Sequence, residues 1–263
     1  MKIGFIGMGN MASAIAVGLM RSKFIDGKDV FVHSRTYERI QPLIEEYNFN
    51  FEKSNSDVAA QSDIIIIGVK PDVMEKVAAE LQKTKTADEK VIVSIAAGWS
   101  FENLKTLFPQ TRCLSIIPNV SVKVNAGVSI IEQQTDLEND ELSFVTEMFE
   151  KLGMVKMLPA EQIGISTAIS GCGPAFAFMF IEALGDAGVQ NGLSREDAYA
   201  LAAQMLLGSA EQFLETKEHP GKLKDSVCSP GGLTIQGVAA LEEEGFRNAV
   251  IKAVSACQEV KKE

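Results

Sequence analysis

Two glycine-rich stretches, one near each end of the chain, carry residue types that could bind anions. The first, residues 7–12 (GMGNMA), follows an apolar run and precedes apolar residues at helical spacing. The second, residues 229–232 (SPGG), precedes a helical pattern whose first turn contains Thr234. A helix that begins directly after such a turn offers free backbone N–H groups and the positive end of its dipole to an anion. Both stretches are therefore candidate sites for phosphate or carboxylate groups.

A strand, a glycine turn and a helix in this order form the dinucleotide-binding fingerprint, here with Ala12 in place of its third glycine. Gly7 lets the chain leave the strand in a tight turn, and Gly9 has no Cβ to hold a pyrophosphate away from the backbone. Ala12 lets the helix pack close to the strand. The alternative is a structural turn that binds nothing. The cofactor-binding residues predicted here are Gly7, Met8, Gly9, Asn10, Met11 and Ala12.

The end of the second predicted strand indicates which dinucleotide binds. About 20 residues after the fingerprint, NAD-binding chains carry an acidic residue that holds the ribose 2′-hydroxyl. Residues 33–36 (HSRT) occupy this place and contain no carboxylate. Ser34 can hydrogen-bond a 2′-phosphate, and the planar guanidinium of Arg35 can pair with it. This favours NADP, bound as NADPH, with NAD as the alternative; otherwise Arg35 is only a solvated charge beside the next helix.

Strands alternate with helices up to about residue 157, which is typical of a doubly wound α/β domain. Apolar runs at residues 64–69, 91–95 and 114–117 predict further strands of a parallel sheet. The loops that follow the carboxyl ends of such strands are where these sheets bind ligands. These loops hold the other predicted cofactor-binding residues, which are Val69, Lys70, Pro71, Ala96, Ala97 and Asn119.

The pattern changes near residue 159, and from residue 163 onward it indicates long helices only. We therefore predict an α/β chain with two domains: a Rossmann-type dinucleotide-binding domain at residues 1–158 and an all-helical domain for dimerisation and substrate binding at 159–263. Residues 200–207 (ALAAQMLL) are apolar nearly all round. A helix of this kind needs more cover than about 100 residues supply. The inference is an interlocked homodimer; the alternative is a central helix buried within its own subunit.

Composition excludes several classes of partner. The formal net charge is −10 and no basic tract offsets it, which argues against binding to nucleic acid or to an anionic membrane surface. The four cysteines lie far apart without a CxxC pair or a histidine cluster, so we expect no metal site and no disulfide framework. The apolar run at the start is broken by glycines, unlike a signal peptide. No stretch approaches the length of a membrane span, and we expect a soluble, cytoplasmic protein.

The missing residues favour reduction of an imine over reduction of a ketone. A carbonyl reductase needs a proton donor for the developing alkoxide. The two histidines are His33, assigned to the cofactor strand, and His219, assigned to a loop. Hydroxyacid dehydrogenases of this two-part plan carry a lysine on the helix after their second glycine motif. Residues 174–181, which follow the SGCG stretch at 170–173, contain no lysine. A protonated C=N substrate already carries its proton.

Eight motifs along essentially the whole chain support a more specific interpretation. They are residues 7–12 (GMGNMA), 69–71 (VKP), 94–98 (SIAAG), 118–119 (PN), 170–176 (SGCGPAF), 181–189 (IEALGDAGV), 219–220 (HP) and 225–235 (DSVCSPGGLTI). Together they resemble the pyrroline-5-carboxylate reductase family. This resemblance implies NAD(P)H-dependent hydride transfer to the C=N bond of 1-pyrroline-5-carboxylate, which gives L-proline in the last step of proline biosynthesis.

The resemblance also implies roles for individual residues. The substrate carboxylate would lie on the backbone of Gly231, Gly232 and Leu233, beside Ser229, and the hydroxyl of Thr234 would act near the ring nitrogen as the catalytic group. A homodimer with intertwined C-terminal helices is implied, with a decamer (a pentamer of dimers) as a larger assembly.

The chain departs from the family pattern at several positions. Ser115 stands where the family usually has arginine, and Cys172 replaces serine. Three alternatives therefore stay open: a reductase of a related cyclic imine, a hydroxyacid dehydrogenase of the same plan, and a non-catalytic NADP-binding paralogue.

Overall fold

The computed structural model describes residues 1–85 and 87–258. The chain packs into two compact units, Met1–Gly171 and Cys172–Glu263, and each is described by itself. The first unit contains the sheet and one helix beyond it, so packing divides the chain later than the functional boundary predicted between residues 158 and 159. That boundary stays a prediction, and residues 259–263 of the predicted helical domain lie outside the described residues.

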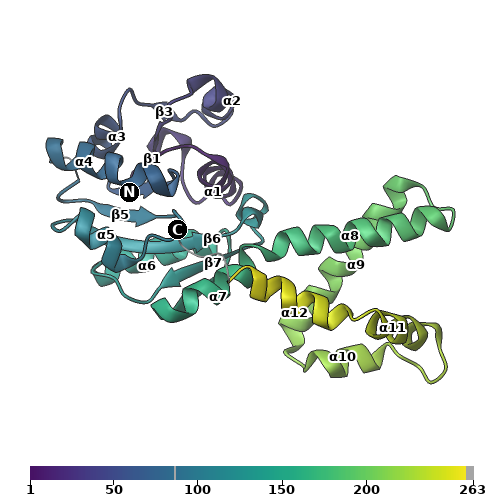
Figure 1. The fold of residues 1–263 in the computed structure, drawn as a ribbon. Helices are drawn as coiled ribbons and strands as arrows, with labels where there is room; N and C mark the ends of the chain where they lie inside the picture. The colour runs from purple at the N-terminus through teal and green to yellow at the C-terminus, as the bar shows by residue number, and fades with distance from the viewer. Residues whose placement is uncertain (86, 259–263) are drawn as a thin grey trace. The chain divides into compact units, whose positions relative to one another are not determined.

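Within the described residues, eight strands of the first unit form one sheet in the order β3-β2-β1-β4-β5-β6-β7-β8 (Figure 1). The strands are β1 (Ile3–Ile6), β2 (Val30–His33), β3 (Asn50–Phe51), β4 (Ile64–Ile67), β5 (Val91–Ser94), β6 (Arg112–Pro118), β7 (Gly127–Glu132) and β8 (Gly153–Leu158). Neighbouring strands are parallel except β6 and β7, which are antiparallel. The predicted doubly wound, Rossmann-type fold is confirmed, and the antiparallel pair makes the sheet mixed.

Helices cover both faces of this sheet. The helices α1 (Asn10–Arg21), α2 (Tyr37–Tyr47) and α6 (Asn139–Glu150) contribute to one buried apolar cluster. The helices α3 (Asn55–Gln61), α4 (Met74–Thr84) and α5 (Phe101–Leu107) contribute to a second cluster. All four residues of β4 are buried and divide between the two clusters. The continuous β-branched run at this strand therefore fills both cores, as such runs do in central parallel strands.

Short elements complete the first unit and were not predicted. β3, α3 and α5 have two, seven and seven residues, so their apolar patterns are too short to show a period. Local capping starts both helices: the side chain of Ser54 accepts a hydrogen bond from the N–H of Asp57, and Ser100 accepts one from Asn103. The 3₁₀ helices are η1 (Gly27–Asp29), η2 (Pro71–Val73) and η3 (Val120–Val124), and α7 (Ala160–Ser170) follows the last strand.

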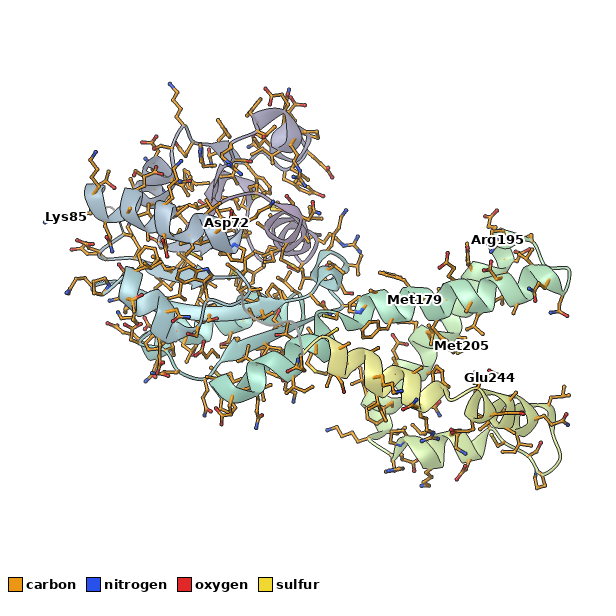
Figure 2. All side chains as sticks on the ribbon, viewed as in Figure 1. Asp72, Lys85, Met179, Arg195, Met205 and Glu244 are labelled. Atoms are coloured by element: carbon orange, nitrogen blue, oxygen red, sulfur yellow. The ribbon has the colours of Figure 1, made fainter. Side chains whose placement is uncertain are left out.

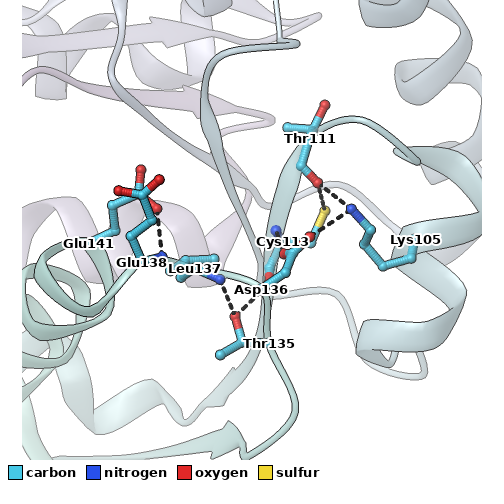
Figure 3. Close-up of polar contacts among 8 residues, drawn as sticks. All are labelled: Lys105, Thr111, Cys113, Thr135, Asp136, Leu137, Glu138 and Glu141. Atoms are coloured by element: carbon cyan, nitrogen blue, oxygen red, sulfur yellow. Dashed lines mark hydrogen bonds and ion pairs between the residues drawn. The ribbon is translucent and has the colours of Figure 1, made fainter.

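A polar cluster holds the start of β6 against the loop that leads into α6 (Figure 3). Asp136 accepts a hydrogen bond of 2.7 Å from the backbone N–H of Cys113 and forms an ion pair of 2.7 Å with Lys105. Thr135 donates its hydroxyl to the carbonyl of Cys113 at 2.8 Å. Burial raises the pKa of the Cys113 thiol to about 12, so this cysteine stays a neutral core residue.

The second unit is helical throughout its described part, as predicted. Its helices are α8 (Gly173–Gln190), α9 (Arg195–Thr216), α10 (Pro220–Ser226), α11 (Leu233–Glu243) and α12 (Phe246–Ala256). Ser194 is the N-cap of α9, because its hydroxyl accepts a hydrogen bond from the N–H of Asp197 at 3.0 Å. At Gly185 an added Cβ would lie 2.3 Å from the ring of Tyr199, so this glycine lets α8 and α9 approach closely.

Large apolar side chains remain exposed on the helices of the second unit. Leu201 on α9 is 62% exposed, and Met179 and Met205, which Figure 2 labels on α8 and α9, are 68% and 46% exposed. The alternative of a central helix buried within its own subunit is therefore wrong for α9. Large exposed apolar side chains on two helices that pack together are characteristic of an interaction surface.

One further expectation requires correction. Among the described residues, the helical segment 160–190, formed by α7 and α8, is long and apolar enough to cross a membrane, although we expected no such stretch. Length and composition are the sole basis of this match. Only 6% of its most apolar window is buried within the chain, which is also the character of a helix that packs against another subunit.

Candidate active site

The first glycine turn has the backbone geometry that its sequence predicts. Gly7 has a φ of +85°, a conformation that favours glycine, and its N–H donates to the carbonyl of His33 at 3.0 Å. Gly9 is the N-cap of α1 and receives no side-chain cap. An added Cβ at Gly9 would have only the Gly68 carbonyl within 4 Å, at 3.7 Å. The start of α1 therefore has open space beside uncapped N–H groups, as a pyrophosphate site requires.

The predicted close packing behind this turn is also present. Ala12 is buried, with 1% of its surface exposed. A Cβ added at Gly68, just after β4, would lie 2.8 Å from the Cβ of Ala12. The N–H of Gly68 donates to the carbonyl of Ile6 at 2.9 Å. The turn after β1 and the loop after β4 are therefore in contact, and small residues at both positions allow it.

A cavity of about 440 Å³ opens beside this turn, within the usual range for small-molecule sites. It brings together side chains and backbone from the ends of β1, β2 and β4. The predicted cofactor-binding residues that line it are Gly7, Met8, Gly9, Ser34, Arg35, Val69 and Lys70. Asn10, Met11, Ala12, Pro71, Ala96, Ala97 and Asn119 are not among its lining residues, and their cofactor contacts stay predictions.

Cationic side chains gather where the 2′-phosphate is expected. Arg35 is exposed in the loop between β2 and α2, and Arg39 and Lys76 line the same cavity. Arg39 donates to the side-chain oxygen of Asn10 at the start of α1. Sequence reasoning missed Arg39 and Lys76, because they lie on α2 and α4 and only the fold brings them beside Arg35. Their charge and position fit a phosphate monoester.

Asn119 has a structural role that its sequence position did not reveal. Its side chain is 6% exposed and donates to the carbonyl of Ser170 at 2.9 Å. Its side-chain oxygen accepts from the N–H groups of Ser121 at 3.2 Å and Val128 at 3.1 Å. The amide thus joins the end of β6 to α7 and to the start of β7.

The second glycine turn leaves the start of α11 open. Gly231 has a φ of +69°, and the N–H of Gly232 donates to the carbonyl of Ser229 at 3.0 Å. Gly232 is the N-cap and no side chain caps the helix. Leu233 is 88% exposed, and Thr234, the second helical residue, is exposed too. The free N–H groups beside a hydroxyl have the geometry that the predicted anion site requires, and binding there stays a prediction.

The predicted site residues therefore form two local groups. The cofactor residues gather in the first unit and the substrate residues, Ser229 and residues 231–234, in the second. No group of three or more His, Cys, Asp or Glu side chains that could hold a metal ion occurs in the described ranges. What the two groups share is an uncapped helix start behind a glycine turn.

Comparison with known proteins supports the resemblance to pyrroline-5-carboxylate reductases over the whole chain. A family model described as pyrroline-5-carboxylate reductase dimerisation matches residues 160–263, and one described as NADP oxidoreductase, coenzyme F420-dependent, matches residues 2–98. The pyrroline-5-carboxylate reductase of Escherichia coli (strain K12) is 40% identical over 98% of this chain and 96% of its own length. That of Synechocystis is 38% identical over 97% and 95%.

The chain belongs to the pyrroline-5-carboxylate reductase family. The crystal structure of the Plasmodium falciparum pyrroline carboxylate reductase, with NADP bound, superposes with a TM-score of 0.88 at 32% identity, covering 98% of this chain and 95% of that one. The matched dimerisation domain includes α7 to α12, so the family explains the exposed apolar side chains on α8 and α9 as a homodimer surface.

Proposed function

We propose that this chain is an NADPH-dependent pyrroline-5-carboxylate reductase that reduces the C=N bond of 1-pyrroline-5-carboxylate and yields L-proline. The observation that carries this function is the pair of uncapped helix starts, one suited to a pyrophosphate and one to a carboxylate. Full-length identity of 40% to the Escherichia coli enzyme supports the substrate. Proline biosynthesis is then its pathway, and the lack of a basic tract fits a small-molecule partner.

The residues of the first unit would hold the cofactor. The N–H groups at the start of α1 bind the pyrophosphate, and Ser34 and Arg35 bind the 2′-phosphate with Arg39 and Lys76. Residues 69–71 and the small residues Ala96 and Ala97 flank the nicotinamide half. When bound, NADPH supplies the hydride, so the protein's part is binding, orientation and exclusion of water.

The residues of the second unit would hold the substrate. The N–H groups of Gly231, Gly232 and Leu233 bind its carboxylate beside Ser229, and the hydroxyl of Thr234 hydrogen-bonds near the ring nitrogen. The protonated imine carries its own proton, so a strong general acid is not required.

An absorbance assay at the NADPH band tests this function. The purified dimer is mixed with NADPH and pyrroline-5-carboxylate, and proline is measured as the product. A panel with related cyclic imines and a 2-keto acid in the presence of NADPH, and with a 3-hydroxy acid in the presence of NADP⁺, separates this activity from the imine reductase and hydroxyacid dehydrogenase alternatives. Failure to oxidise NADPH with any substrate, while still binding it, would favour the non-catalytic paralogue.

Thr234→Ala tests the proposed catalytic residue. Loss of a hydroxyl that hydrogen-bonds the reacting ring is expected to lower kcat by about 10- to 100-fold. The Kd for NADPH, measured by calorimetry, should change less than about twofold, because Thr234 is remote in sequence from the cofactor residues. Thr216→Ala is the matched control, because the Thr216 hydroxyl donates to the carbonyl of Gln212 and accepts from the N–H of Glu218, none of which is a proposed site residue. Unchanged kcat in Thr234→Ala would remove this residue from the site.

The assembly and its location complete the proposal. The dimer is the minimal unit, and a decamer built as a pentamer of dimers is the larger assembly that the family resemblance favours. A cytoplasmic location fits free cysteines, since Cys113, Cys172, Cys228 and Cys257 are all unpaired. Analytical ultracentrifugation distinguishes dimer from decamer by mass.

A further inference from the structure

The single tryptophan of the sequence lies between the two loops proposed to flank the nicotinamide. Trp99 follows the turn at residues 96–98, and its backbone N–H donates to the carbonyl of Ala96 at 3.3 Å. Its indole N–H donates to the carbonyl of Pro71 at 3.2 Å. Pro71 starts η2, directly after Lys70 in the loop that follows β4. One side chain therefore joins the loop after β4 to the loop after β5.

Buried side chains from the next two strands fix the position of Trp99. Ser115 on β6 is 4% exposed, and its hydroxyl donates to the carbonyl of Trp99 at 2.8 Å. Glu132 on β7 is 2% exposed, and its carboxylate accepts from the N–H of Phe101 at 2.8 Å. These two bonds hold the chain on both sides of Ser100. Trp99 also packs against the second apolar cluster, so its ring has little freedom.

We propose that Trp99 is a positioning residue for the dinucleotide, acting through the carbonyl of Pro71 and held in place by Ser115 and Glu132. This proposal rests on the proposed function and extends it to a residue with no direct contact to a substrate. The indole N–H fixes the distance between the loops that flank the nicotinamide half. The Trp99 indole and the Ser115 hydroxyl together stabilise the loop after β5.

The test compares three variants by calorimetric titration with NADPH and by steady-state kinetics. Trp99→Phe keeps an aromatic ring and removes the N–H donor, and Ser115→Ala removes the hydroxyl that holds Trp99. Thr135→Val is the matched control, because Thr135 also donates one hydroxyl to a backbone carbonyl, that of Cys113, at the other end of β6 (Figure 3). Thermal unfolding of all three reports general stability.

Both loop variants are expected to raise the Kd and the KM for NADPH by about three- to tenfold, the usual effect of one lost hydrogen bond. The KM for pyrroline-5-carboxylate should change less than about twofold in both loop variants. Thr135→Val should leave the Kd and the KM for NADPH unchanged, although it lowers Tm by about as much as the loop variants do. Unchanged NADPH binding in Trp99→Phe overturns the proposal. An equal loss of NADPH binding in Thr135→Val also overturns it, because the effect would then be general destabilisation.

Calorimetry separates this outcome from failure of the proposed function. NADPH binding to wild-type protein does not require turnover, so the role of Trp99 is measured even if pyrroline-5-carboxylate is not the substrate. Quenching of the single tryptophan emission by bound NADPH in the wild type gives a second readout, since it requires the dinucleotide to lie close to Trp99. Absence of quenching on saturation with NADPH contradicts the assigned position.

Discussion

Arg35 illustrates how one side chain acquires a specific role from its neighbours. The sequence places it after β2, where it would be either a phosphate ligand or a solvated charge. The fold surrounds the same cavity with Arg39 and Lys76, while Asp72 and Glu80 also line it. Cations that line a cavity bind a dianionic 2′-phosphate more strongly than a neutral 2′-hydroxyl.

Replacement of Arg35 by Asp is expected to shift cofactor preference toward NADH. A carboxylate repels the 2′-phosphate and accepts a hydrogen bond from a 2′-hydroxyl. The ratio of kcat/KM for NADPH to that for NADH should fall by about tenfold or more, which corresponds to loss of one charge-assisted hydrogen bond. Steady-state kinetics with both cofactors measure it. Arg21→Asp, an exposed position outside the cavity, is the control, and an unchanged ratio in Arg35→Asp would exclude the 2′-phosphate role.

At the scale of elements, the two proposed sites reuse one device, a glycine turn that begins a helix without a side-chain cap. Side chains cap some other helix starts, namely α3 by Ser54, α5 by Ser100 and α9 by Ser194, whereas α2, α4, α7, α8 and α12 also begin without a side-chain cap. At Gly9 and Gly232 no such acceptor is present, so the first-turn N–H groups of α1 and α11 remain available to a ligand. A missing cap is therefore not by itself the mark of a binding site; the two proposed sites combine it with a preceding glycine of positive φ, Gly7 and Gly231.

The β7 strand carries the buried carboxylate that supports α5. Burial raises the pKa of Glu132, the hydrogen bond from the N–H of Phe101 opposes the shift, and the neighbouring Glu102 raises the pKa further. A glutamate whose pKa is higher in the folded than in the unfolded chain binds protons more readily when folded. Its contribution to the free energy of unfolding therefore falls as pH rises from the ordinary glutamate value, about 4.3, to the raised value.

Glu132→Gln is expected to remove this pH dependence. The amide oxygen can still accept the N–H of Phe101, and glutamine does not ionise. The free energy of unfolding of the variant minus that of the wild type should therefore increase with pH through this window. Denaturant unfolding at a series of pH values measures the difference. Glu102→Gln, at an adjacent position in α5, is a control for the charge alone. A difference that is constant with pH would contradict the assignment.

At the scale of the whole molecule, the helical unit exposes more apolar surface than one subunit can cover. Leu201, Met179 and Phe178 are each more than 60% exposed. Their helices fall within residues 160–263, which match the family's dimerisation domain. The apolar character of the segment 160–190 is thus accounted for by a subunit interface.

Leu201→Glu is expected to weaken the dimer. Loss of one buried leucine and burial of an unpaired charge on both copies should raise the dimer Kd by about 100-fold or more. Sedimentation equilibrium over a range of concentrations measures this change. Val124→Glu places the same substitution at an exposed apolar position outside the dimerisation domain and is expected to leave the Kd unchanged. A Leu201→Glu protein with the wild-type Kd would show that this face of α9 lies outside the interface.

The sequence by itself determined the elements with strong periods and the two glycine turns. The β-branched run of β4 fills both faces of a sheet, and Gly7 requires its positive φ, so local chemistry suffices there. It also determined the family through motifs spread over the whole chain. These features depend on neighbours in sequence, which is why pattern reasoning finds them.

Only the tertiary structure decided which distant residues meet. Arg39 and Lys76 join Arg35 because α2 and α4 pack beside the same strand ends, and the Asn119 amide is occupied by Ser170 and Val128. Trp99 reaches Pro71 because β4 and β5 are adjacent in the sheet. Strand order and side-chain contacts depend on pairings between residues far apart in the chain, and a single sequence does not encode these in any local period.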